Sequence, residues 1–207
     1  DSDVAADARP YSVPAPSSIV PSDETIARMA EALNSAKKVA IFAGIGVSGA
    51  HDEVIALADT LNAPIGHSLR GKDQIQFDNP FDVGMTGLLG YGAAAEGLHD
   101  ADVMVMLGTD FPYDQFLPDV TTIQVDTNPA VIGRRTGVTV PVYGDVKSTI
   151  LKLLPELQPK KDRSFLDKTL AKHDKLMNKA VGAYTRKVEK ITPIHPELKD
   201  ALEPILG

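Results

Sequence analysis

Apolar residues along the chain fall into short continuous runs separated by stripes with helical spacing. The continuous runs predict five buried β-strands, at 38–43 (KVAIFA), 63–68, 102–107 (DVMVML), 121–126 (TTIQVD) and 138–142. The stripes predict helices over 23–35, over roughly 50–62, and after Asp145, which is placed to cap a closing helix. Strands and helices therefore alternate along the chain.

Strands that are apolar throughout, rather than at every second position, are typical of a parallel sheet buried on both faces. We therefore predict an α/β fold, a doubly wound and mostly parallel sheet with helices on both faces. Residues 69–84 are more polar, and we expect a long loop there, followed by a Gly/Ala-rich helix over about 88–98.

The two ends of the chain differ in composition from the middle. Residues 1–21 are rich in proline and lack apolar periodicity, which indicates an interdomain linker. The α/β domain is expected over 22–157, and 158–207 is expected to be a helical linker, with one charged amphipathic helix or two shorter ones over 159–192. We therefore expect the chain to be a piece of a larger protein.

Composition excludes several function classes. The 207 residues include no cysteine, which removes disulfides, thiolate metal sites and thiol nucleophiles. A net charge of −7 argues against nucleic acid as the main partner. No apolar run is long enough to span a bilayer and no signal peptide is apparent, so a cytoplasmic location is expected. We identify no hydrolase motif, Walker lysine or metal-ligand spacing, and we assign no catalytic or metal-binding residue.

Glycine or an acid stands at the carboxyl end of most predicted strands. Ligands of open parallel sheets bind outside these ends, so the loops together predict a groove for an extended ligand such as a dinucleotide. The loops are GIGVSG (44–49), GMTGLLGYG (84–92), GTDFPY (108–113), VDTNPAVIG (125–133) and YGDV (143–146).

The first of these loops matches G-x-G-x-x-G through Gly44, Gly46 and Gly49, between a strand and a helix. That context suits a pyrophosphate, although a tight structural turn is the alternative. Nicotinamide cofactors also require an acid after the next strand, and that strand (APIGHS) ends without one. The pattern therefore disfavours NAD.

The other loops keep two interpretations each. In the 84–92 loop, exposed amides could cradle a phosphate or approach a flat ring, and Thr86, Gly87 and Leu88 are the better candidates because they precede the helix. Close helix–sheet packing is the alternative, above all for Gly90 and Gly92. Phe111 could stack on a ligand ring or pack under its loop. Asp126 could accept ribose hydroxyls, and Asp145 could read an adenine edge together with the Val146 amide, while capping is the alternative for both acids.

Four segments taken together resemble the central domain of thiamine-diphosphate enzymes of the pyruvate oxidase type. They are GKDQIQFDNPFDVGMTGLLG, ADVMVMLGTDFPYDQFLP, IQVDTNPAVIGRR and YGDVKSTILKLLPEL, in that order. Within this family the chain is most similar to bacterial pyruvate:quinone oxidoreductases, and the resemblance covers about residues 10–197.

The resemblance implies that this domain binds FAD. By matching motifs, it assigns the contacts to Gly44 and Gly46; to His67, Leu69 and Arg70; to Thr86, Gly87, Leu88 and Leu89; to Gly108, Thr109, Asp110, Phe111 and Pro112; and to Asp126, Asn128, Gly144, Asp145 and Val146.

The parent reaction implied by the resemblance is oxidative decarboxylation of pyruvate to acetate and carbon dioxide, with electrons passing through FAD to a quinone. Thiamine diphosphate and magnesium would bind the flanking domains of the parent, a homotetramer in this family and in some cases peripheral to the membrane. No sequence matching those domains is found, so we expect the fragment to be inactive. The alternatives are a stand-alone NAD-binding oxidoreductase domain, or a non-catalytic scaffolding domain with an empty groove.

Overall fold

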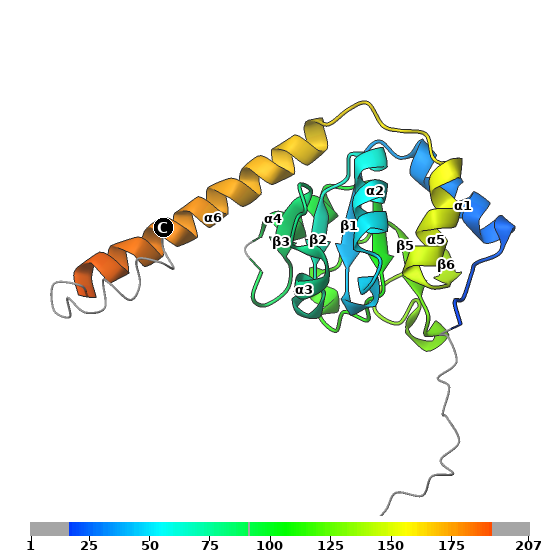
Figure 1. Ribbon diagram of the computed structural model, residues 1–207, viewed down its shortest axis with the longest axis horizontal. Helices are drawn as coiled ribbons and strands as arrows, with labels where there is room; N and C mark the ends of the chain where they lie inside the picture. Colours follow the sequence, from blue (N-terminus) through cyan, green and yellow to red (C-terminus); the bar gives the residue numbers. More distant parts are fainter. Residues whose placement is uncertain (1–16, 91, 192–207) are drawn as a thin grey trace, which may run out of the picture.

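A computed structural model describes residues 17–90 and 92–191 of the chain, with side chains described as far as residue 183. Its core is a six-stranded parallel sheet with strand order β3-β2-β1-β4-β5-β6 (Figure 1). The strands are β1 (Val39–Ala43), β2 (Ile65–His67), β3 (Asp82–Met85), β4 (Val103–Leu107), β5 (Thr121–Asp126) and β6 (Val140–Tyr143). This confirms the predicted fold class.

Helices cover both faces of the sheet. On one face α1 (Asp23–Ser35), α2 (His51–Leu61) and α5 (Val146–Leu153) pack together over a continuous apolar core. The opposite face is covered by α4 (Ala93–His99) and the beginning of α6 (Ser164–Ile191). The remaining elements are α3 (Lys72–Ile75) and the 3₁₀ turns η1 (Ile45–Val47), η2 (Leu69–Gly71), η3 (Asp114–Phe116), η4 (Pro129–Val131) and η5 (Leu154–Glu156).

Strand β1 shows why the strand sequences are apolar at every position. Ile41 and Ala43 point into the core beneath α1, α2 and α5, whereas Ala40 and Phe42 pack against α4 and α6. Successive side chains of a strand point to opposite faces, so a strand covered on both sides needs apolar residues throughout.

Most predicted elements lie where the sequence placed them. Helix α1 has the predicted bounds, and Ser22 caps it, because the Ser22 hydroxyl accepts a hydrogen bond from the Thr25 N–H at 3.2 Å. The predictions for 1–16 and 192–207 lie outside the described residues.

Two predictions were wrong in detail. The expected loop at 69–84 contains α3 and the start of β3, which pairs with β2 and forms the edge of the sheet as far as the described residues go. The predicted helix over 88–98 begins only at Ala93, because Gly87 and Gly92 adopt positive φ angles that interrupt a helix.

Helix α6 is a single helix whose first turns pack against the domain. Phe165, Leu166 and Thr169 are buried against α4 and the sheet. The rest of the helix extends past the β3 edge of the sheet (Figure 1). Within the described residues, no helix is both long and apolar enough to span a bilayer.

Candidate functional site

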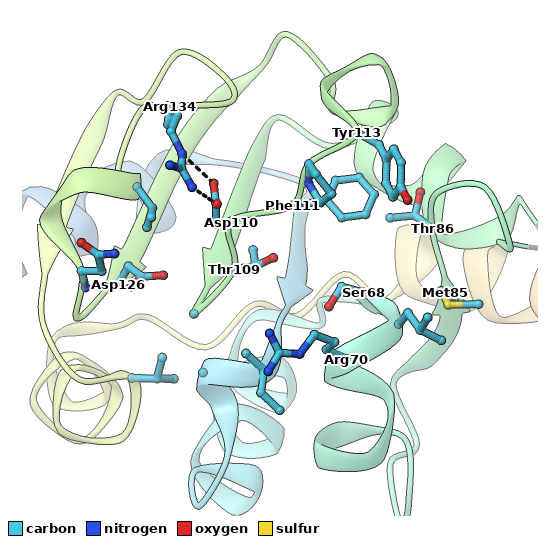
Figure 2. Close-up of a pocket in the computed structure, with 18 of the residues that line it drawn as sticks. Ser68, Arg70, Met85, Thr86, Thr109, Asp110, Phe111, Tyr113, Asp126 and Arg134 are labelled. Atoms are coloured by element: carbon cyan, nitrogen blue, oxygen red, sulfur yellow. Dashed lines mark hydrogen bonds and ion pairs between the residues drawn. The ribbon is translucent and has the colours of Figure 1, made fainter.

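A cavity of about 840 Å³ opens at the carboxyl ends of the strands (Figure 2). It lies where the strand order reverses between β1 and β4, the point at which ligands of doubly wound sheets bind. Its lining comes from the loops after β1 to β5 and from the first residue of α5: Ile45, Gly46, Ser68, Leu69, Arg70, Met85, Thr86, Leu88, Leu89, Gly108, Thr109, Asp110, Phe111, Pro112, Tyr113, Asp126, Thr127, Asn128, Val131, Arg134 and Val146.

Two glycine loops form the base of the cavity by packing backbone against backbone. The Gly46 N–H donates to the Gly108 carbonyl at 3.0 Å, and a Cβ on Gly46 would lie 2.6 Å from Gly108 Cα. Gly44 is not part of the lining, since a Cβ there would meet Gly108 and Thr109. The G-x-G-x-x-G pattern therefore first serves loop packing, while Gly46 and Gly108 also face the cavity.

The loop after β3 places a buried hydroxyl and two exposed leucines beside the cavity. Thr86 is 3% exposed, and its Oγ1 atom has no hydrogen-bond partner among the described residues. Leu88 and Leu89 are 66% and 65% exposed. Gly87 does not line the cavity; a Cβ there would lie 3.0 Å from the Phe111 ring.

Aromatic side chains from the loop after β4 form one wall of the cavity. Phe111 is buried and meets the Phe42 ring edge-on, with the ring centroids 5.0 Å apart. Tyr113 lies edge-on to Phe111 at 5.4 Å and is partly exposed. Phe111 therefore packs under its loop, which is one of the two roles expected from the sequence. It also forms part of the cavity wall.

Charged groups of both signs line the cavity. Asp110 accepts hydrogen bonds from Arg134 through two pairs of atoms, and from Arg135 Nε at 3.1 Å. Arg70 lies across the cavity from this group (Figure 2). The sequence prediction missed Arg134, although it directly follows the VDTNPAVIG motif; Met85 and Val131 were missed as well. Guanidinium groups suit phosphate oxygens because their planar N–H groups match them in pairs.

Asp126 and Asn128 line the cavity beyond β5. The Asp126 carboxylate accepts one hydrogen bond from the Asn128 N–H at 2.8 Å. Asn128 caps the short η4 turn, since its side-chain oxygen accepts from the Ala130 N–H. Asp126 therefore does not cap η4, and it lines the cavity.

Asp145 is used differently. Its carboxylate caps α5 by accepting from the Ser148 N–H at 2.9 Å, and it does not line the cavity. Gly144 is also outside the lining, because its open side is filled by the Pro21 ring and Thr149. At this end the cavity is bordered by Val146.

His67 also points away from the cavity, whereas Ser68, Leu69 and Arg70 line it. Its imidazole is 1% exposed, and the distance from His67 Nε2 to Asp82 Oδ1 is 3.5 Å. Its side chain thus turns toward the interior beside β3, and burial lowers the pKa of His67.

The residues present fit a dinucleotide such as FAD. The cavity volume lies in the upper part of the range for small-molecule sites, about 300–1,000 Å³. Thr86 offers an unpaired buried hydroxyl, Arg70 and Arg134 offer charge for a diphosphate, and Asp126 offers a carboxylate for ribose hydroxyls.

Comparison with known proteins identifies the same domain. Residues 26–153 match the family model described as "Thiamine pyrophosphate enzyme, central domain", which is more than half of the chain. The X-ray structure titled "a putative thiamin diphosphate-dependent enzyme isolated from Mycobacterium smegmatis" shares the fold, with a TM-score of 0.61 and 24% sequence identity over 75% of this chain and 32% of that one.

Curated relatives agree at the level of the family. An uncharacterized 42.6 kDa protein of Pseudomonas amyloderamosa is 43% identical over 77% of this chain and 41% of its own length. The "Putative thiamine pyrophosphate-containing protein YdaP" of Bacillus subtilis is 37% identical over 71% of this chain and 26% of its own length.

Acetolactate synthases of mycobacteria are also relatives, so the match is to the wider family and not specifically to pyruvate oxidases. The chain spans less than half the length of these curated relatives. By its fold and by the family match, the chain belongs to the thiamine pyrophosphate enzymes and contains their central domain.

Proposed function

We propose that this domain binds FAD in the cavity at the carboxyl ends of the strands and orients it within a larger thiamine-diphosphate enzyme. The observation that carries the proposal is the buried Thr86 hydroxyl, which lines the cavity and has no partner among the described residues. A buried hydroxyl without a hydrogen bond is costly, and a ligand would remove that cost.

The charges of the cavity support an adenine dinucleotide. Arg70 and Arg134 provide guanidinium groups for a diphosphate, and Asp126 provides an acceptor for ribose hydroxyls. Met85, Leu88 and Leu89 supply an apolar side for a flat ring. The ring of a bound flavin supplies the electron-transfer chemistry; the protein residues bind it and exclude water.

The parent reaction we propose is oxidative decarboxylation of pyruvate, with a quinone as electron acceptor. The sequence resemblance to pyruvate:quinone oxidoreductases supports it. The isolated chain is then expected to be inactive, because we assign its residues only to FAD binding. An assay with pyruvate, thiamine diphosphate, magnesium, FAD and a quinone analogue should therefore read background, and turnover above a no-enzyme control would contradict the proposal.

Calorimetric titration of the chain with FAD, ADP and NAD tests the ligand directly. FAD should bind most tightly, since it can fill both the charged and the apolar parts of the cavity. ADP should bind more weakly, and NAD more weakly than FAD because β2 ends at His67 and Ser68 without an acid. Tighter binding of NAD, or no binding of any of the three, would contradict the FAD assignment.

A pair of variants tests the role of Thr86. Thr86→Val removes the unpaired hydroxyl and should weaken FAD binding by about tenfold, the effect of losing one ligand hydrogen bond, without lowering the melting temperature of the free protein. Thr149→Val is the matched control, since the Thr149 hydroxyl is also buried and unpaired but lies outside the cavity. Equal FAD affinity in the two variants would show that the Thr86 hydroxyl does not bind FAD.

A further inference from the structure

A buried cluster of three ionisable side chains lies behind the cavity, where α6 meets the edge of the sheet. It consists of His67 at the end of β2, Asp82 at the start of β3, and His173 on α6. Asp82 lies between the two imidazoles: its Oδ1 atom is 3.5 Å from His67 Nε2, and its Oδ2 atom is 4.0 Å from His173 Nε2. His67 is 1% exposed, and the side chains of Asp82 and His173 are 11% and 14% exposed.

The hydrogen bonds around the cluster determine where its protons lie. His67 Nδ1 is 3.1 Å from the Ser68 carbonyl, which can only accept, so Nδ1 carries the proton of the neutral imidazole. Among the described residues, His67 Nε2 then has no donor or acceptor partner, and neither does His173 Nδ1, although both atoms are buried.

Asp82 has partners other than the imidazoles. Its Oδ1 atom accepts from the Gly84 N–H at 3.0 Å, and its Oδ2 atom accepts from the Gln76 side chain at 3.3 Å. These bonds come from the sheet edge and from the end of α3, not from α6. The carboxylate therefore keeps its position beside His67 whether or not α6 is docked.

His173 reaches this cluster because β3 leaves room for it. Gly84 has a positive φ angle and no side chain, and a Cβ there would lie 2.9 Å from the His173 ring. The imidazole occupies that space and closes the cluster from the α6 side. Docked α6 thus places the His173 imidazole beside the carboxylate that His67 also approaches, while Asp82 and His67 both belong to the sheet.

We propose that His67, Asp82 and His173 form a proton-dependent contact that holds α6 on the sheet edge and releases it when the cluster takes up a proton. Docking of α6 keeps water from His67 and brings a second imidazole toward it. Undocking would admit water to His67 Nε2 and leave the Asp82 carboxylate as its partner. A proton is therefore bound more readily when α6 is undocked.

The pKa of His67 agrees with this direction. It is lowered chiefly by burial, and the charges of Lys72 and His173 lower it further, whereas the Ser68 carbonyl and Asp82 raise it. A lowered pKa means that the docked state disfavours the proton, so docking is at full strength above the ordinary histidine pKa of about 6.5 and weakens as pH falls below it.

Two charged pairs also join α6 to α4. Lys172 contacts Glu96, and Lys168 contacts Asp100 at 2.9 Å between Nζ and Oδ2. The hydrogen bond between Lys168 and Asp100 raises the pKa of Lys168 and lowers the pKa of Asp100, so this pair holds α6 at both pH values. The described residues contain no group of three acidic or histidine side chains suited to a metal ion, so we assign the cluster to protons.

The His67–Asp82–His173 cluster is also connected to the cavity, because the residues that follow β2 and β3 line the cavity wall. Ser68 follows His67 directly, and the Thr86 N–H donates to the His67 carbonyl at 3.2 Å. The proposal nevertheless stands apart from the identity of the ligand, because its test follows α6 in the chain without any nucleotide.

Hydrogen exchange of the α6 backbone over residues 165–173, corrected for the intrinsic effect of pH, measures docking. In the unmodified chain we expect protection to fall several-fold from pH 7.5 to 5.5, because the undocked state binds a proton more readily over this range. Protection that does not change between these pH values would overturn the proposal.

Two variants identify the groups responsible. His67→Asn keeps an N–H that can reach the Ser68 carbonyl but cannot take up a proton, and it should abolish the pH dependence of α6 protection. His173→Gln, on the more exposed helix, should reduce it even if His67→Asn does not fold. Full pH dependence in His173→Gln would overturn the proposal.

His99→Gln is the matched control. His99 lies at the end of α4, next to α6, but is exposed and outside the cluster. This variant should keep the pH dependence of the unmodified chain. Loss of that dependence in His99→Gln would assign the pH dependence to His99 instead of the His67–Asp82–His173 cluster, and would contradict the proposal.

Discussion

Asp126 and Asp145 follow neighbouring strands, β5 and β6, and stand at the same edge of the sheet, yet the structure uses them differently. Asp126 faces the cavity and accepts one hydrogen bond from its own loop, while Asn128 caps the next turn. Asp145 must cap α5 itself, because its loop offers no other capping side chain. An acid at the end of a strand therefore faces the cavity here only where another residue takes over the cap.

The same distinction applies to the glycines of the cavity. Gly46 and Gly108 face the cavity, but they are also required by the backbone contact between their loops. Residues that serve local structure should change the stability of the free protein, whereas residues that serve the ligand should change only its affinity. Variants of these residues therefore separate the two roles.

The largest expected effect is at Gly46. Gly46→Ala would place a Cβ 2.6 Å from Gly108 Cα, where backbone must move, and we expect a loss of about 3 kcal/mol in unfolding free energy, equivalent to a fall in melting temperature of roughly 6–12 °C. Gly137→Ala is the control, since no atom lies within 4 Å of its Cβ position. Similar melting temperatures for the two variants would show that the loop contact is not tight.

The second effect is at Asp126. Asp126→Asn keeps an oxygen for the Asn128 N–H but loses the charge toward a ribose, so FAD and ADP should both bind more weakly by about 2 kcal/mol, or roughly thirtyfold. Riboflavin lacks the adenosine ribose of FAD, so its affinity should not change. An unchanged ADP affinity would show that Asp126 does not contact the ribose.

The third effect is at Asp145. Asp145→Ala removes the cap of α5, and we expect a loss of about 1 kcal/mol in the unfolding free energy of the free protein, with ADP affinity preserved. Asp145→Asn should restore most of the stability, because asparagine caps helices about as well as aspartate. Weaker ADP binding in both variants, without a change in melting temperature, would reverse the assignment.

The smallest effect is at Asn128, which combines both tasks. Its oxygen caps η4 while its amide group remains available at the cavity. Asn128→Ala should therefore lower stability by about 0.5 kcal/mol, since η4 is a short turn, and should weaken ADP binding only a few-fold. Thermal unfolding and calorimetry on one sample would show whether both changes occur together.

The sequence predicted the fold well where burial dictates residue type. Helix α1 and strand β5 have their predicted bounds, because each has a clear period and a marked end. Strand β3 was missed, since Asp82 and Gly84 interrupt an apolar pattern in a strand of only four residues. It is an edge strand, and its partner β2 and the covering helix α6 supply contacts that no local pattern reports.

The candidate site was predicted by loop and only partly by residue. The strand ends do meet at one cavity, as parallel order requires. The direction of the His67 side chain and the reach of Arg134 to Asp110 depend on tertiary contacts across the sheet. Whether the lining residues bind FAD stays a prediction.

The strand order also has a consequence for how the chain reaches its native state. The middle of the sheet joins β1 to β4, with Val39 beside Val103, so the segment that carries β2, β3 and α4 must close as a loop when that pair forms. Pairings between residues distant in sequence slow folding, because the loop must close before its contacts are gained. We expect the first three strands to associate early on the ribosome, and the cavity to be completed only when β4 and β5 join.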